Sequence, residues 1–172
     1  DALSQSIRDY WDQEGLPDRL LFSFHGIPER YERLGDPYRR HCQHTAEQVA
    51  TRLGLQHEQW QVAYQSRFGP EPWLQPYTDE VLAAWAEQKI NSVHAIAPGF
   101  SADCLETLDE IDREYRELFE GTSGGRFHYI PALNTRPDHI EALAEIAATA
   151  IRGWLKPSSH TPLKHTREAA SP

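Results

Sequence analysis

Hydrophobic and polar positions follow two patterns along this chain. Short, nearly continuous apolar runs are typical of buried strands, and they occur at residues 20–24, 60–64, 92–97 and 126–130. Elsewhere apolar residues recur every three or four positions, which predicts helices at about residues 3–14, 37–53, 78–89, 102–119 and 137–155. Glycine and proline follow several of these segments, as Gly54 does, and mark where they end.

The order of these segments indicates an α/β fold. Four short strands that alternate with helices form βαβ units, which place the strands in one parallel sheet with helices on both faces. Right-handed crossovers leave few arrangements of such a sheet. We therefore expect a three-layer α/β/α domain whose four-stranded parallel sheet has the order 2-1-3-4.

The last part of the chain has a different composition. Residues 156–172 contain one large aliphatic side chain, Leu163, and three basic residues against one acidic residue. We expect an α/β domain over residues 1–155 and a polar, flexible tail over residues 156–172. A solvated tail is the simpler interpretation, although its basic residues leave contact with an anionic surface open.

Composition narrows the class of protein. The chain has 172 residues, of which 39% are hydrophobic, enough for the core of one domain. Its net charge of −9 argues against nucleic acid as the main partner. Two cysteines exclude a disulfide scaffold and a cysteine-only zinc or iron–sulfur site, and they suit a reducing, cytoplasmic location. No apolar run approaches the roughly 18–20 residues that a membrane span needs.

The chain begins with Asp1 and contains no methionine. No signal-peptide pattern accounts for this beginning. We therefore expect a fragment or a processed part of a longer protein.

Chemically useful residues follow the first and third predicted strands. Ligands of open α/β sheets bind at the carboxyl ends of the strands, where the strand order reverses, and here that point lies between these two strands. His25 ends the first strand, whereas Asp103 and Glu106 follow the third, in the expected first turn of a helix. An imidazole can ligate a metal or move protons. A hydrogen-bonded structural histidine and carboxylates that favour a helix start remain the alternatives.

A row of carboxylates continues along that helix. Glu106, Glu110 and Glu114 are four residues apart, and a wider, π-type turn would align them better than a regular α-helix. The opposite, apolar face is expected to hold Leu105, Leu108, Ile111, Tyr115 and Leu118. Histidine with glutamate suits a loosely held divalent metal, while a solvated acidic face is the alternative.

Other candidates for chemistry are weaker. Cys42 lies on the apolar stripe of a predicted helix and is expected to be buried. Cys104 stands beside carboxylates, which disfavour a thiolate, so we do not expect a catalytic cysteine. Ser66 and Ser101 lack the context of a nucleophile elbow, and no phosphate-binding glycine motif is present.

Four segments together resemble the ferrochelatase family, in order and closest to proteobacterial members. They are LLFSFHGIP at residues 20–28, GDPY at 35–38, YQSRFGPEPWL at 64–74 and PGFSADCLETL at 98–108. The resemblance covers about residues 18–155. The family has two similar α/β halves that face each other across a porphyrin cleft, and this chain resembles the C-terminal half, a chelatase-like half domain.

The resemblance implies insertion of ferrous iron into protoporphyrin IX with release of two protons. It implies that His25 and Glu106 form the catalytic and metal-binding pair. Further roles implied by the family concern a proton or metal path and contacts to the macrocycle: Asp103, Glu110 and Glu114 for the path, and Trp73, Phe100 and Arg67 for the porphyrin.

The resemblance also bears on partners. Iron is a substrate, no cofactor is required, and the absence of cysteine from the tail predicts no iron–sulfur cluster. The expected partners are protoporphyrin IX, ferrous iron and the N-terminal half of the same enzyme, and peripheral membrane association stays open. Alternatives are a coproporphyrin or cobalt chelatase of the same type, or an α/β binding lobe without catalytic activity.

Overall fold

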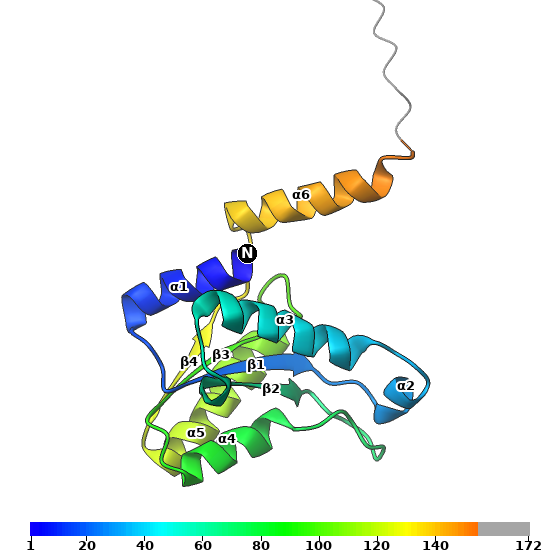
Figure 1. The fold of residues 1–172 in the computed structure, drawn as a ribbon. Helices are drawn as coiled ribbons and strands as arrows, with labels where there is room; N and C mark the ends of the chain where they lie inside the picture. The colour runs from blue at the N-terminus through cyan, green and yellow to red at the C-terminus, as the bar shows by residue number, and fades with distance from the viewer. Residues whose placement is uncertain (155–172) are drawn as a thin grey trace, which may run out of the picture.

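The apolar runs form a four-stranded parallel sheet in a computed structural model that describes residues 1–154 (Figure 1). The strands are β1 (Arg19–His25), β2 (Trp60–Gln65), β3 (Ser92–Ile96) and β4 (Arg126–Ile130). Their spatial order is β2-β1-β3-β4, and every neighbouring pair is parallel. The predicted fold class and strand order are therefore confirmed.

Helices cover both faces of this sheet (Figure 1). One face carries α1 (Ala2–Glu14) and α3 (Tyr38–Leu53), and the other carries α4 (Thr78–Glu87), η2 (Glu106–Tyr115) and α5 (Arg116–Ser123). Two short helices, α2 (Glu29–Arg33) and η1 (His57–Gln59), lie in connections. The chain continues after β4 into α6 (Pro137–Ile151).

Alternation along β1 builds a core on each face. Leu20, Phe22 and Phe24 pack with residues of α1 and α3, whereas Leu21 packs with residues of α4, η2 and α5. Cys42 belongs to the first of these clusters and is buried, as predicted. Burial raises the pKa of its thiol to about 11, so this cysteine is chemically inert.

The helix after β3 differs from its prediction. It begins at Leu105 and Glu106 rather than at residue 102, runs as a π-helix to Tyr115 and continues as α5 to Ser123. Asp103 consequently lies in the loop before the helix and not in its first turn, because its backbone and carboxylate bond to the chain beyond β4.

The predicted apolar face of this helix is also wrong in part. Leu105 and Leu108 are 74% and 53% exposed, and Leu118 is exposed as well. The buried face holds Thr107, Ile111, Tyr115 and Phe119, which are four residues apart. A π-type turn contains more residues than an α-turn, so it aligns positions at this wider spacing.

Helix α6 departs most from expectation. Its apolar side chains Ile140, Leu143 and Ile146 recur at helical spacing, as in a helix that packs on a core, but they are exposed because the helix extends away from the layers of the sheet (Figure 1). The predicted helix reached residue 155, whereas α6 ends at Ile151. The predicted polar tail over residues 156–172 lies outside the described residues.

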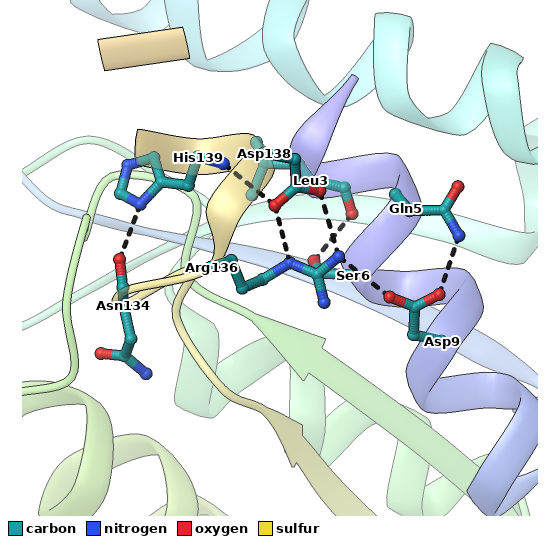
Figure 2. A network of polar contacts seen from close by, with 8 residues as sticks. All are labelled: Leu3, Gln5, Ser6, Asp9, Asn134, Arg136, Asp138 and His139. Carbon is teal, nitrogen blue, oxygen red and sulfur yellow. Dashed lines mark hydrogen bonds and ion pairs between the residues drawn. The ribbon is translucent and has the colours of Figure 1, made fainter. Parts of the chain in front are cut away.

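A polar network fixes the beginning of α6 to α1 (Figure 2). Arg136 Nη2 donates to Asp9 of α1 at 2.9 Å, and Arg136 Nε donates to Asp138 at 3.1 Å. The ring of His139 donates from Nδ1 to the carbonyl oxygen of Asn134 at 2.9 Å. The first turn of α6 is thus held in place, although most of its length contacts little else in residues 1–154.

Candidate active site at the carboxyl ends of β1 and β3

His25 ends β1 at the edge of the sheet where ligands of α/β folds bind. Its Nδ1 lies 2.7 Å from the carbonyl oxygen of Gly26. Because a carbonyl oxygen can only accept, Nδ1 carries the proton, and Nε2 of the neutral ring is left with its lone pair. No hydrogen bond engages Nε2 among residues 1–154. The imidazole is therefore oriented and its second nitrogen can take a proton or bind a metal.

Aromatic side chains gather around this imidazole. The ring centroids of Trp73 and Phe100 each lie 6.4 Å from that of His25. Trp73 is buried, and its Nε1 donates to the carbonyl oxygen of Phe68 at 3.0 Å. The Phe68 ring packs 4.9 Å from that of Trp73 while remaining mostly exposed. Phe68 belongs to the YQSRFGPEPWL segment at residues 64–74 but was not among the predicted site residues. In sequence alone, an aromatic residue before a glycine is equally typical of an ordinary loop.

Glu106 opens η2 near His25. Hydrogen bonds from the thiol of Cys104 and from the residue's own backbone amide lower the pKa of Glu106 below its usual value, and His25 lowers it further when its ring is protonated. Its carboxylate therefore stays ionised at neutral pH. An ionised carboxylate beside an imidazole with a free nitrogen can stabilise an imidazolium or hold a cation.

Glu110, four residues after Glu106, accepts hydrogen bonds from three donors. The backbone amide of Ser66 and the hydroxyl of Tyr115 each donate to Glu110 Oε1 at 2.8 Å, and the Ser66 hydroxyl donates to Oε2. Ser66 follows β2 with φ of 62°, a left-handed conformation that is uncommon for a residue with a β-carbon. The sequence around Ser66 argues against a nucleophile and contains no signal that this residue anchors a glutamate.

The other two acidic residues of the predicted path lie apart from each other. Glu114 is exposed and pairs with Arg113 at 3.0 Å. Asp103 is surrounded by donors: burial raises the pKa of its carboxyl, but hydrogen bonds from Asn134, Tyr129 and neighbouring groups outweigh burial and lower it overall. The predicted row is therefore not one continuous line of free carboxylates.

Arg67 has partners within the chain. It forms two hydrogen bonds with Asp79, at 2.7 and 2.8 Å, and its guanidinium lies 4.1 Å from the centre of the Tyr77 ring. Asp79 raises the pKa of this arginine. A contact to a porphyrin propionate, as the resemblance implies, would compete with these interactions.

Metal-binding capacity is limited within the described part of the chain. Residues 1–154 contain no group of three or more His, Cys, Asp or Glu side chains arranged to hold an ion. No helix in the same range is long and apolar enough to cross a membrane. His25 and Glu106 could therefore supply at most part of a coordination shell.

Comparison with known proteins identifies the family of this chain. The Ferrochelatase family model matches residues 1–151. Curated ferrochelatases from Thioalkalivibrio sulfidiphilus and Nitrosococcus oceani are 53% and 51% identical over 154 residues, or 90% of this chain and 42% of each relative. The ferrochelatase of Pseudoalteromonas atlantica is 47% identical over 95% of this chain and 45% of its own length. The chain thus spans less than half the length of these relatives.

A solved structure supports the fold independently. A CbiX protein of cobalamin (vitamin B12) biosynthesis from Marinobacter aquaeolei VT8 superimposes with a TM-score of 0.50 over 80% of this chain and 99% of that chain, at 15% identity. At this identity the likeness concerns the fold alone. The family match over nearly all described residues, together with the identity to curated relatives, shows that this chain belongs to the ferrochelatase family.

Proposed function

We propose that this chain is the half of a ferrochelatase that carries the reacting side chains, and that the whole protein inserts ferrous iron into protoporphyrin IX. The reaction exchanges two pyrrole N–H protons for one Fe²⁺ and yields haem and two protons. The observation that carries the proposal is the placement of His25 between the rings of Trp73 and Phe100, with Nε2 free of hydrogen bonds in residues 1–154, on the side of the sheet where Glu106 begins η2.

Proton removal falls to His25. Its unprotonated Nε2 can accept a pyrrole proton, while the Nδ1 bond to Gly26 keeps the ring in place during the transfer. Glu106, whose pKa is lowered in part by the charge of His25, would stabilise the resulting imidazolium electrostatically or hold the incoming cation before the macrocycle does. A weak protein site suits this task, because the metal must leave it for the four porphyrin nitrogens.

The partly exposed ring of Phe100 offers a contact for a flat, apolar macrocycle, and the buried ring of Trp73 supports His25 from within the chain. One half domain offers only one side of such a site. Since the relatives are more than twice as long as the matched region, we expect the remaining part of the protein to supply the opposing wall. The isolated chain should then have little or no activity.

The test uses the full-length protein with ferrous iron and protoporphyrin IX. We expect His25→Ala and Glu106→Gln each to lower kcat by at least tenfold, since a general base contributes about 10² to 10⁴ in rate. Parallel assays with coproporphyrin and with cobalt identify the preferred substrates. If both variants keep full activity, this half is an α/β lobe without a catalytic role and the proposal is wrong.

A further inference from the structure

Asp103 and Asn134 join two loops at the carboxyl edge of the sheet by a reciprocal pair of hydrogen bonds. The backbone amide of Asp103 donates to Asn134 Oδ1 at 2.9 Å, and Asn134 Nδ2 donates to Asp103 Oδ2 at 2.7 Å. The backbone amide of Asn134 also donates to the carbonyl oxygen of Ser101 at 2.9 Å. The loop that follows β3 is thus tied at two points to the loop that follows β4.

The second oxygen of Asp103 accepts three further hydrogen bonds. Its Oδ1 accepts from the Tyr129 hydroxyl at 2.8 Å and from the Ala132 amide and Thr107 hydroxyl at 3.1 Å each. Four donors therefore surround this carboxylate, three of them at Oδ1 and one at Oδ2. Protonation of Oδ1 would displace one of its three donors, and protonation of either oxygen would weaken the hydrogen bonds that the charged carboxylate accepts.

The partner of Asp103 is itself restrained from the far side. The imidazole of His139, in the first turn of α6, donates to the carbonyl oxygen of Asn134 at 2.9 Å (Figure 2). Asn134 adopts φ of 48°, a left-handed conformation that asparagine tolerates better than most residues. These contacts fix the backbone of Asn134, and its side chain is held by the bonds from Nδ2 to Asp103 and to the carbonyl oxygen of Ala132.

The Asp103–Asn134 pair lies, along the chain, between two residues of the candidate active site. Phe100 precedes Asp103 by three residues and Glu106 follows it by three, and both lie near His25. Thr107, bonded to Asp103, is fully buried in the first turn of η2. Moving Asp103 would consequently shift the ring and the carboxylate on either side of it.

We infer that Asp103 is a positioning residue, which fixes Phe100 and Glu106 relative to His25, and that it does not carry protons in the reaction. This role departs from the one that the family resemblance implies. The inference concerns the arrangement of the site, and for its activity readout it rests on the proposed function. The Asp103–Asn134 pair allows a direct test, because substitutions can exchange the donating amide and the accepting carboxylate between the two positions.

The experiment compares Asp103→Asn, Asn134→Asp and the double variant in the full-length protein, by thermal unfolding and by iron insertion. In Asp103→Asn, the side-chain amides of residues 103 and 134 face each other. In Asn134→Asp, the two carboxylates face each other. Each single change should lower Tm and reduce kcat at least tenfold. The double variant restores one donor facing one acceptor, but the carbonyl oxygen of Ala132 loses the bond that Asn134 Nδ2 donates to it at 3.0 Å. We therefore expect the double variant to regain a measurable part of the lost Tm and at least tenfold of the kcat lost in Asp103→Asn, with an unchanged pH profile.

A proton carrier gives a different pattern. If Asp103 moves protons, the double variant recovers Tm but stays as inactive as Asp103→Asn, and the inference is overturned. It is equally overturned if Tm does not recover, since the pair then does not hold the loops. Asp12→Asn, an exposed change of the same chemistry on α1, serves as the matched control. If the proposed function itself fails, unfolding still tests the pair, because that readout needs no turnover.

Discussion

The indole of Trp73 lies against Gly26 so closely that a β-carbon at position 26 would come within 3.1 Å of Trp73 Cε3. The same β-carbon would lie 3.0 Å from the carbonyl oxygen of Gln65, which accepts the Gly26 amide at 2.8 Å. Gly26 therefore continues the ladder between β1 and β2 while leaving room for the indole. The position directly after His25 has space for a hydrogen atom and little more.

Gly26→Ala should accordingly disturb both stability and activity. The backbone carbonyl cannot move without breaking the ladder, so the indole or the turn must shift, and overpacking of this kind costs about 1–3 kcal/mol. Urea unfolding of the chain measures this loss. In the full-length protein, kcat for metal insertion should fall too, because the Gly26 carbonyl also orients His25.

Gly121→Ala is the matched control for this change. Gly121 lies within α5 with open space around its position, so alanine there should leave stability unchanged or raise it by about 0.5–1 kcal/mol. Equal effects of the two substitutions would show that contact with Trp73 is unimportant.

Tyr115→Phe tests the anchoring of Glu110. The substitution removes a buried hydroxyl that donates to the carboxylate at 2.8 Å and leaves Glu110 with its two bonds from Ser66. Hydrogen bonds to charged groups contribute about 1.5–3 kcal/mol, and we expect a loss of unfolding free energy in the lower part of that range. Tyr31→Phe, at an exposed tyrosine of α2, should cost much less in the same urea titration.

The stability of the fold should depend on pH through His94. This residue of β3 is 1% exposed, its Nδ1 has no hydrogen-bond partner in residues 1–154, and the His128 ring lies 4.9 Å away. Burial, with a smaller contribution from the charge of His128, lowers the pKa of His94 from 6.5 to about 4. The other titratable groups nearby are Tyr10, whose ring packs against His94, and Glu14, 3.9 Å from His128.

The sign of this dependence follows from the lowered pKa. The unfolded chain binds a proton at His94 below about pH 6.5 and the folded chain only near pH 4, so stability is full above 6.5 and falls as the pH decreases towards 4. At pH 5 this residue should account for a loss of about 2 kcal/mol. Unfolding of His94→Leu should show a smaller difference between pH 7 and pH 5 than the wild type, whereas His57→Gln should not.

The strand order of the sheet could be predicted from the sequence, whereas the hydrogen bonds within the site could not. Four apolar runs and right-handed crossovers left few arrangements, and the expected order β2-β1-β3-β4 is the one observed. The same reasoning placed His25 and Glu106 near each other, because the carboxyl ends of β1 and β3 meet at one edge. What it could not supply was the set of donors around each acidic residue, since Tyr129 and Asn134 lie far from Asp103 in the chain.

The π-helix shows where periodicity fails. An apolar face counted at the α-helical spacing includes Leu105 and Leu108, but the wider turn buries Thr107 and Ile111 instead. The carboxylate row hinted at this geometry, yet spacing by four also fits an ordinary solvated helix face. Only the packing of η2 on the sheet decides between the two.

The apolar face of helix α6 is not covered by any other part of residues 1–154. Ile146 is 66% exposed, and Ile140 and Leu143 lie on the same helix with large exposed surfaces. The matched relatives are more than twice as long as the matched region. We expect the corresponding further part of the full-length protein to cover this face. Ile146→Asp should therefore change the unfolding free energy of this chain by less than about 0.5 kcal/mol. In the full-length protein it should cost about 1.5–3 kcal/mol, the value of a buried isoleucine side chain. Urea unfolding of both forms measures the difference, and an equally small effect in the full-length protein would mean that the face stays exposed there.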